Sequence, residues 1–187
     1  AMLNALQFQR RRNARLESIA PDRGAECSAD TSDALVAALP HLVAGIEGFF
    51  RAVAVGEDRL GIQDSLRIMS AWFTYGHHDM VHAAVRSGID RSSIAVWLRV
   101  VPQLISRVGT PERSIRQLLG TLLTKVGVAF PHAMLYPISV CYSTAEPGSL
   151  RRSAARKILR DIREAHAALC REGQTISDEL IRVAILW

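Results

Sequence analysis

The amino-acid sequence predicts an all-α protein, and two patterns support this prediction. Apolar residues recur at helical spacing along nearly the whole chain, most clearly at Ile115, Leu118, Leu119, Leu122, Leu123 and Val126. No stretch of four or more residues alternates between apolar and polar side chains with turn residues on either side, as a half-buried strand would. Because 49% of the 187 residues are hydrophobic, the chain can bury a sizeable core, which excludes a wholly disordered protein.

Helix-breaking and capping residues divide the chain into about nine predicted helices. We place these helices at residues 2–18, 33–56, 62–75, 79–88, 92–107, 111–127, 132–143, 149–170 and 175–187. Pro40 and Pro102 lie inside their segments and should kink or split them. Pro111 suits a first helical position, with Thr110 before it as the cap. Residues 21–33 form the one loop-like linker of any length, and they separate a basic first helix from the rest.

A weak internal repeat suggests how the helices are arranged. The pairs 36 residues apart are Pro111 and Pro147, Arg116 and Arg152, Leu122 and Ile158, Leu123 and Leu159, and Val126 and Ile162. A period near 36 with two helices per unit is typical of a HEAT- or TPR-like α-solenoid, in which antiparallel helix pairs stack. Coincidence between two ordinary amphipathic helices is the alternative. The matched prolines favour the repeat, and Pro102 and Pro137 are also 35 residues apart.

Charge, cysteine content and hydrophobicity indicate where in the cell the protein is located and what it could bind. The net charge of +5 permits an acidic partner but does not require one. The three cysteines, Cys27, Cys141 and Cys170, are too few and too scattered for a disulfide framework, so we expect a reducing, cytoplasmic location. The most apolar stretch, residues 34–55, is interrupted by Pro40 and by charged residues, so we expect a buried helix that does not span a membrane.

Motifs of catalysis are missing from this sequence. It has no phosphate-binding glycine loop, nucleophile elbow or kinase motif, so we expect no catalytic residue and no cofactor in the chain itself. His77, His78, Asp79 and His82 form the one cluster of metal-ligand type, with His78 and His82 on one helical face. A third ligand at defined spacing is absent, so the start of a helix is the favoured interpretation and we expect no metal.

One basic segment has the pattern of a solvated helix face. In residues 149–173, Lys157 with Asp161 and Arg160 with Glu164 are opposite charges at i, i+4 spacing. No aromatic residue interleaves with these arginines to stack on bases, so we do not expect nucleic-acid binding.

A second basic cluster lies in the predicted first helix. Arg10, Arg11, Arg12 and Arg15 have no acidic neighbour until Glu17. Such a cluster gains from a polyanion, to which guanidinium groups donate bidentate hydrogen bonds. We therefore predict a polyanion site at these four arginines, with a solvated basic face as the alternative.

Four aromatic side chains lie within helical apolar patterns. We expect all four to pack in the core or between helices, and they are Trp72, Phe73, Trp97 and Tyr136.

Five stretches in order along the chain are informative together: Asp64–Gly76 (DSLRIMSAWFTYG), Trp97–Val108 (WLRVVPQLISRV), Leu122–Gly127 (LLTKVG), Pro131–Val140 (PHAMLYPISV) and Glu179–Trp187 (ELIRVAILW). They resemble the target-of-rapamycin (TOR) family of Ser/Thr protein kinases, which belongs to the phosphatidylinositol-3-kinase-related kinases. The resemblance is close from about Leu39 to Trp187 and looser over residues 1–20.

The resemblance implies a domain organisation. Residues 34–176 would be the HEAT-like end of the FAT domain, the α-solenoid that clamps the kinase domain in this family. Residues 1–20 would be a helix of the preceding FAT repeat, and residues 21–33 a shortened variable insert. Residues 177–187 would be the truncated first helix of the rapamycin-binding bundle.

The resemblance also implies a function. The chain would be a non-catalytic scaffold segment of a kinase that controls cell growth in response to nutrients. Its partners would be the kinase domain and the remaining FAT and rapamycin-binding regions of the parent, together with TOR complex subunits. The parent would hold an inositol polyphosphate near the first-helix arginines and would associate with endomembranes. The alternative is a free-standing HEAT-like adaptor that binds a peptide or a partner helix. The apolar run 180–187, which no helix-ending residue follows, argues for a piece of a longer chain.

Overall fold

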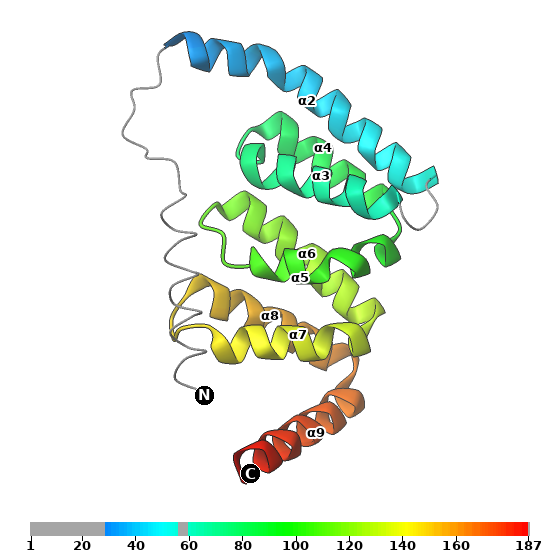
Figure 1. The fold of residues 1–187 in the computed structure, drawn as a ribbon, viewed down its shortest axis with the longest axis vertical. Coiled ribbons are helices and arrows are strands. Elements are labelled where there is room, and N and C mark those ends of the chain that lie inside the picture. The colour runs from blue at the N-terminus through cyan, green and yellow to red at the C-terminus, as the bar shows by residue number, and fades with distance from the viewer. Residues whose placement is uncertain (1–28, 56–59, 187) are drawn as a thin grey trace. The chain divides into compact units, whose positions relative to one another are not determined.

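The computed structural model describes residues 29–55 and 60–186, and this part of the chain contains helices and no strand (Figure 1). The elements are α2 (Ala29–Val55), α3 (Leu60–Tyr75), α4 (Asp79–Arg91), the 3-10 helix η1 (Ile94–Val100), α5 (Val101–Ser106), α6 (Arg113–Ala129), α7 (Pro131–Thr144), α8 (Leu150–Ala165) and α9 (Ala167–Leu186). The predicted all-α class is confirmed. The chain divides into two units between Ala37 and Ala38, and the helices from α3 to α9 belong to the second.

The helices of this second unit stack as pairs along two layers. In one layer α3 contacts η1, and α5 contacts α7; in the other α4 contacts α6, and α6 contacts α8 (Figure 1). Within a pair, α3 packs on α4, α5 on α6, and α7 on α8. This is the arrangement of an α-solenoid, in which each pair covers the apolar face of its neighbour.

One continuous core runs through the pairs. The predicted inward face of α6 is confirmed, because Leu119, Leu122, Leu123 and Val126 are all fully buried. Apolar side chains of every helix from α2 to α9 join this core.

The aromatic residues divide between core and surface. Trp72 and Trp97 are buried in the core, as predicted, and Phe73 is half-buried against it. The prediction is wrong for Tyr136, which is 71% exposed. The inward face of α7 is formed instead by Met134, Ile138 and Cys141, so Tyr136 falls on the outer face.

The backbone repeats with the 36-residue period seen in the sequence. Phe130 ends α6 with φ −134° and ψ 64°, and His166 ends α8 with φ −135° and ψ 55°. Each residue donates its N–H to the carbonyl four residues earlier, that of Val126 or Ile162, over 2.8 and 2.9 Å. The next helix, α7 or α9, starts at the following residue, so the backbone makes the same turn between helices in both repeats.

Two prolines have different consequences for their helices. The predicted helix 92–107 is split, as expected, into η1 and α5, and Pro102 lies in the first turn of α5. Pro40 does not split α2, which continues through it from Ala29 to Val55. The predicted linker is also too long, because residues 29–33 belong to α2; no glycine or proline stands between Ala29 and Pro40 to end a helix there.

The start of α6 differs from the prediction. Glu112, not Thr110, caps this helix, and its carboxylate accepts a hydrogen bond from the Ser114 N–H over 3.5 Å. The carbonyl of Thr110 instead accepts from the guanidinium of Arg116. That bond holds Thr110 and Pro111 in the loop before the helix.

The break between the last two helices also differs from the prediction. It lies at His166, and α9 then runs unbroken through residues 171–174, where we expected a gap. His166 Nε2 donates to the carbonyl oxygen of Val128 over 2.7 Å, which ties this junction to the end of α6. Gly173 continues α9, and a Cβ atom added there would lie 3.7 Å from Leu135 Cδ1, an ordinary van der Waals distance.

The helix α2 includes a stretch, Ala37–Val55, that is long and apolar enough to cross a membrane, with mean hydropathy 1.3. One such helix is weak evidence for a membrane span, because the core helix of a soluble protein passes the same test. Only 22% of this stretch is buried, so the prediction of a buried helix is wrong for most of it, although one face of α2 joins the core. The Phe50 ring lies 6.3 Å from the Trp97 ring and directly against Gly88 of α4.

Candidate functional site

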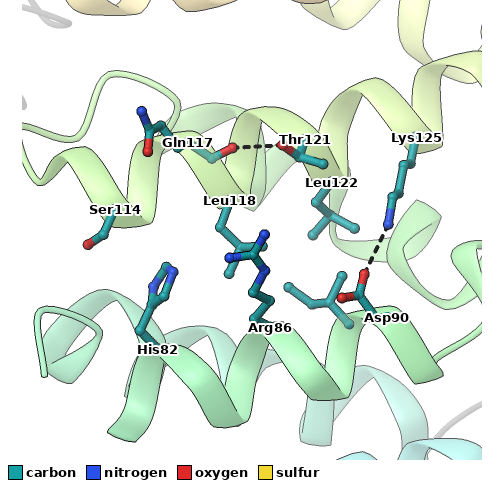
Figure 2. Close-up of a pocket in the computed structure, with 10 residues that line it drawn as sticks. His82, Arg86, Asp90, Ser114, Gln117, Leu118, Thr121, Leu122 and Lys125 are labelled. Carbon is teal, nitrogen blue, oxygen red and sulfur yellow. Dashed lines mark hydrogen bonds and ion pairs between the residues drawn. The ribbon is translucent and has the colours of Figure 1, made fainter. Parts of the chain in front are cut away.

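A polar groove of about 210 Å³ lies between α4 and α6 (Figure 2). Ten residues line it: His82, Arg86, Ile89 and Asp90 from α4, and Ser114, Gln117, Leu118, Thr121, Leu122 and Lys125 from α6. Ile89 and Leu122 are buried, and Leu118 is half-buried. The groove therefore has an apolar floor and polar rims.

The helical period places the polar groups along the groove. His82, Arg86 and Asp90 are spaced four residues apart and so share one face of α4. In Figure 2 the side chains of His82 and Arg86 point across the groove towards α6. Gln117 and Thr121 line the opposite wall by the same spacing, and the Thr121 hydroxyl donates to the Gln117 carbonyl over 3.1 Å.

An ion pair closes one end of the groove. Lys125 Nζ lies 3.0 Å from Asp90 Oδ1, with side chains 47% and 55% exposed. An exposed ion pair of this kind contributes only about 0–1 kcal/mol to the stability of the fold. Its consequence here is that the Asp90 carboxylate is paired with Lys125 and not with Arg86. In the next repeat Asp161, 36 residues after Lys125, accepts from Thr124 over 3.4 Å. Both Lys125 and Asp161 thus contact the preceding helix of the same layer.

Several donors of the groove have no partner among the described residues. The guanidinium of Arg86 makes no hydrogen bond or ion pair there, and the same holds for the side-chain amide of Gln117. Nδ1 of His82 is buried without a hydrogen-bond partner in this part of the chain. Buried polar atoms are normally paired, so the groove offers unused hydrogen-bonding capacity.

The interface of α6 with α8 is packed much more closely. A Cβ atom at Gly127 would come within 2.7 Å of Ile162 Cγ1, so the two helices touch where this glycine stands. Between α4 and α6, long polar side chains face each other instead, and the helices leave the groove open (Figure 2).

A cationic cluster lies on α8, beside an aromatic ring of α7. The guanidinium carbons of Arg152 and Arg156 lie 4.6 and 5.8 Å from the centre of the Tyr142 ring. Hydrogen bonds from Arg156 and Arg152, and then the charges of both, hold the pKa of Tyr142 below its usual value of 10.0. Sequence reasoning missed this cluster because Tyr142 comes from the neighbouring helix. Pairing α7 with α8 as an antiparallel hairpin was the signal that could have found it.

Only one of the two ion pairs predicted on α8 forms. Arg160 Nε lies 3.6 Å from Glu164 Oε1, as predicted. The prediction of an ion pair between Lys157 and Asp161 is wrong. Asp161 instead pairs with Arg160 over 3.2 Å and accepts a hydrogen bond from the Thr124 hydroxyl of α6.

The predicted polyanion site on the first helix has no structural description. Arg10, Arg11, Arg12 and Arg15 lie outside the described residues, and their polyanion site stays a prediction.

The histidine cluster lies at the start of α4. His78 is the extended residue before the helix, and its ring centre is 4.0 Å from that of His77. Over residues 29–55 and 60–186, no three His, Cys, Asp or Glu side chains are placed to hold a metal ion.

Comparison with known proteins identifies relatives of this chain. Residues 80–183 match the family described as serine/threonine-protein kinase ATR-like, HEAT repeats. The chain is 40% identical over 147 residues to the serine/threonine-protein kinase mTor of Drosophila melanogaster. It is 35% identical over 151 residues to the serine/threonine-protein kinase TOR of Arabidopsis thaliana, and 35% identical over 147 residues to TOR2 of Saccharomyces cerevisiae.

These alignments cover most of this chain but little of each relative. Each takes in 79% of the chain and about 6% of the relative's length. The resemblance to TOR kinases is confirmed, and a HEAT repeat agrees with the helix pairs and the 36-residue period described above. The chain belongs to the HEAT-repeat family of ATR-like serine/threonine-protein kinases, and its relatives include the TOR kinases of animals, plants and fungi.

Proposed function

We propose that this chain is a non-catalytic scaffold segment of a TOR-like Ser/Thr protein kinase, and that it clamps and positions the kinase domain of the same polypeptide. The observation that carries this proposal is the stack of helix pairs with one continuous core, in a chain whose relatives are kinases. Stacked repeats present an extended surface whose shape is set by the packing of each pair on the next. Such a surface can hold a second domain in a fixed orientation.

The domain assignment belongs to the same proposal. Residues 34–176 form the HEAT-like end of a FAT domain, and residues 177–187 begin the rapamycin-binding bundle. Because α9 runs without a break from Ala167 to Leu186, this boundary falls inside one helix. A continuous helix would couple the orientation of the bundle to that of the solenoid.

The proposal extends to the parent protein and its setting. The parent controls cell growth in response to nutrients, acts with TOR complex subunits and lies in the cytoplasm, associated with endomembranes. It binds an inositol polyphosphate through the cluster of Arg10, Arg11, Arg12 and Arg15. Inositol hexakisphosphate should then raise the melting temperature of the native parent, and charge reversal at Arg10 and Arg11 should abolish the rise.

The proposal is tested on the native polypeptide that carries this sequence. We expect a polypeptide much longer than 187 residues that contains a kinase domain and phosphorylates a protein substrate. The 187-residue chain alone should transfer no phosphate. A native polypeptide with no kinase domain would overturn the proposal and leave the free-standing adaptor.

A further inference from the structure

We infer that the groove between α4 and α6 binds a carboxylate side chain on an acidic segment of the parent polypeptide, with Arg86 as the main binding residue. The inference deepens the proposed function, because it names the chemistry by which the solenoid holds another part of the parent. The inference rests on the proposed function only in taking the acidic segment to be part of the parent polypeptide. The binding chemistry follows from the groove itself.

The first step is that Arg86 lacks the partner its helix offers. Asp90 lies four residues after Arg86 on the same face of α4, a spacing at which opposite charges commonly pair. Asp90 is instead bound across the groove to Lys125 over 3.0 Å. The guanidinium of Arg86 is thus left exposed beside an ion pair, with five N–H donors to offer.

The second step is the charge of the groove. Its charged lining residues are Arg86, Lys125 and Asp90, so the balance of two positive charges and one negative is +1. A carboxylate carries one negative charge and matches this balance, and it accepts two parallel hydrogen bonds from a guanidinium. A phosphate group carries nearly two negative charges and would need a second free cation, whereas Lys125 is already paired.

The third step is the shape of the lining. Gln117 lines the opposite wall, with its side-chain amide turned away from Arg86 in Figure 2, and a change of rotamer would let it donate to the same carboxylate and so join α4 to α6. The apolar floor of Ile89, Leu118 and Leu122 suits the methylene groups of a glutamate. These features favour an acidic peptide segment over a free inorganic anion.

The experiment uses the 187-residue chain and three short peptides that differ only at two central positions. The first peptide carries glutamate there, the second glutamine and the third phosphoserine. Each is titrated into isotope-labelled protein at low salt, and the side-chain NMR signals of Arg86 and Gln117 are followed. We expect the glutamate peptide to bind and to shift both signals, and the glutamine peptide to shift neither.

Two matched variants separate the groove from the general positive field of the protein. Arg86→Gln should raise the Kd of the glutamate peptide by about ten-fold or more, because it removes a charged bidentate contact. Arg163→Gln makes the same change of charge on α8, at an exposed arginine away from the groove, and should raise the Kd by less than about two-fold. Circular dichroism of both variants checks that the helices are retained.

Any of three results would overturn the inference. The glutamate peptide could bind no better than the glutamine peptide, the two variants could weaken binding equally, or the phosphoserine peptide could bind more tightly than the glutamate peptide. None of these results bears on the proposed scaffold role, which is tested by the size and activity of the native polypeptide. Conversely, a groove that binds glutamate in a parent without a kinase domain would refute the scaffold role alone.

Discussion

Arg116 and Arg152 lie 36 residues apart, and each donates a hydrogen bond to a backbone carbonyl of the loop before its own helix. Arg116 Nη1 donates to the carbonyls of Thr110 and Pro111 over 2.6 and 2.8 Å. Arg152 Nη1 donates to the carbonyl of Ala145 over 2.9 Å. Each arginine stands in the first turn of its helix and binds the loop that leads into that helix, so the repeated residue has a repeated role.

The contact of Arg116 predicts a measurable loss of stability. A hydrogen bond from a charged donor is worth about 1.5–3 kcal/mol, and Arg116 is half-buried, so we expect Arg116→Gln to lower the free energy of unfolding by about 1–2 kcal/mol. Arg113→Gln, at an exposed position of the same helix, should stay within about 0.5 kcal/mol of the wild type. Urea titrations of both variants compare them, and equal values would contradict the role of Arg116.

Two glycines of α6 should respond oppositely to alanine. At Gly127 the new Cβ would meet Ile162 of α8, so Gly127→Ala should cost about 1–3 kcal/mol through overpacking. At Gly120 nothing lies within 4 Å of that position, so Gly120→Ala should stabilise the helix by about 0.5–1 kcal/mol. Thermal unfolding of the two variants should move the melting temperature in opposite directions. A stabilising Gly127→Ala would show that α6 and α8 do not touch there.

Truncation in the core should be costly at Leu122. This side chain is fully buried, and Leu122→Ala should cost about 2–5 kcal/mol in a denaturant titration. Val128→Ala is the surface control, because Val128 is exposed, and it should cost much less. A cost below about 0.5 kcal/mol for Leu122→Ala would mean that the inward face of α6 is misassigned.

The Tyr142 cluster predicts a pH dependence at alkaline pH. Arg156 and Arg152 favour the phenolate, so the pKa of Tyr142 is lower in the folded chain than in the unfolded chain. A lowered folded pKa of an acid adds stability that is fully present above the unfolded pKa and is lost as the pH falls through the folded pKa. The contribution of Tyr142 to stability should therefore grow as the pH rises through its folded pKa towards 10.0.

The measurement for this prediction isolates one phenol. With Tyr75 and Tyr136 replaced by phenylalanine, the ultraviolet absorbance of the phenolate reports Tyr142 alone, since the chain has three tyrosines. Adding Arg156→Gln should raise the midpoint of that titration. An unchanged midpoint would contradict the contact between Arg156 and Tyr142.

The 36-residue repeat and the buried face of α6 could be predicted from the sequence, because both depend on the spacing of residues along one chain. The inward face of α6 and the repeat of Arg116 at Arg152 both follow from a pattern of apolar and charged residues along one chain. The end of α8 at His166 was not predictable, because it is stabilised by the Val128 carbonyl, 38 residues away. The groove was missed for the same reason. In the part of the chain that the structure describes, Arg86 has no ion-pair partner because Asp90, four residues later on α4, pairs with Lys125 of α6.

The scaffold role is tested most directly by lysine cross-linking of the native parent polypeptide followed by mass spectrometry. The chain has two lysines, Lys125 at the end of the groove and Lys157 on the exposed face of α8. If the solenoid positions a kinase domain, Lys125 or Lys157 should cross-link to lysines of the kinase domain in the same polypeptide. Cross-links from both lysines to separate proteins, with none to a kinase domain, would contradict the scaffold role.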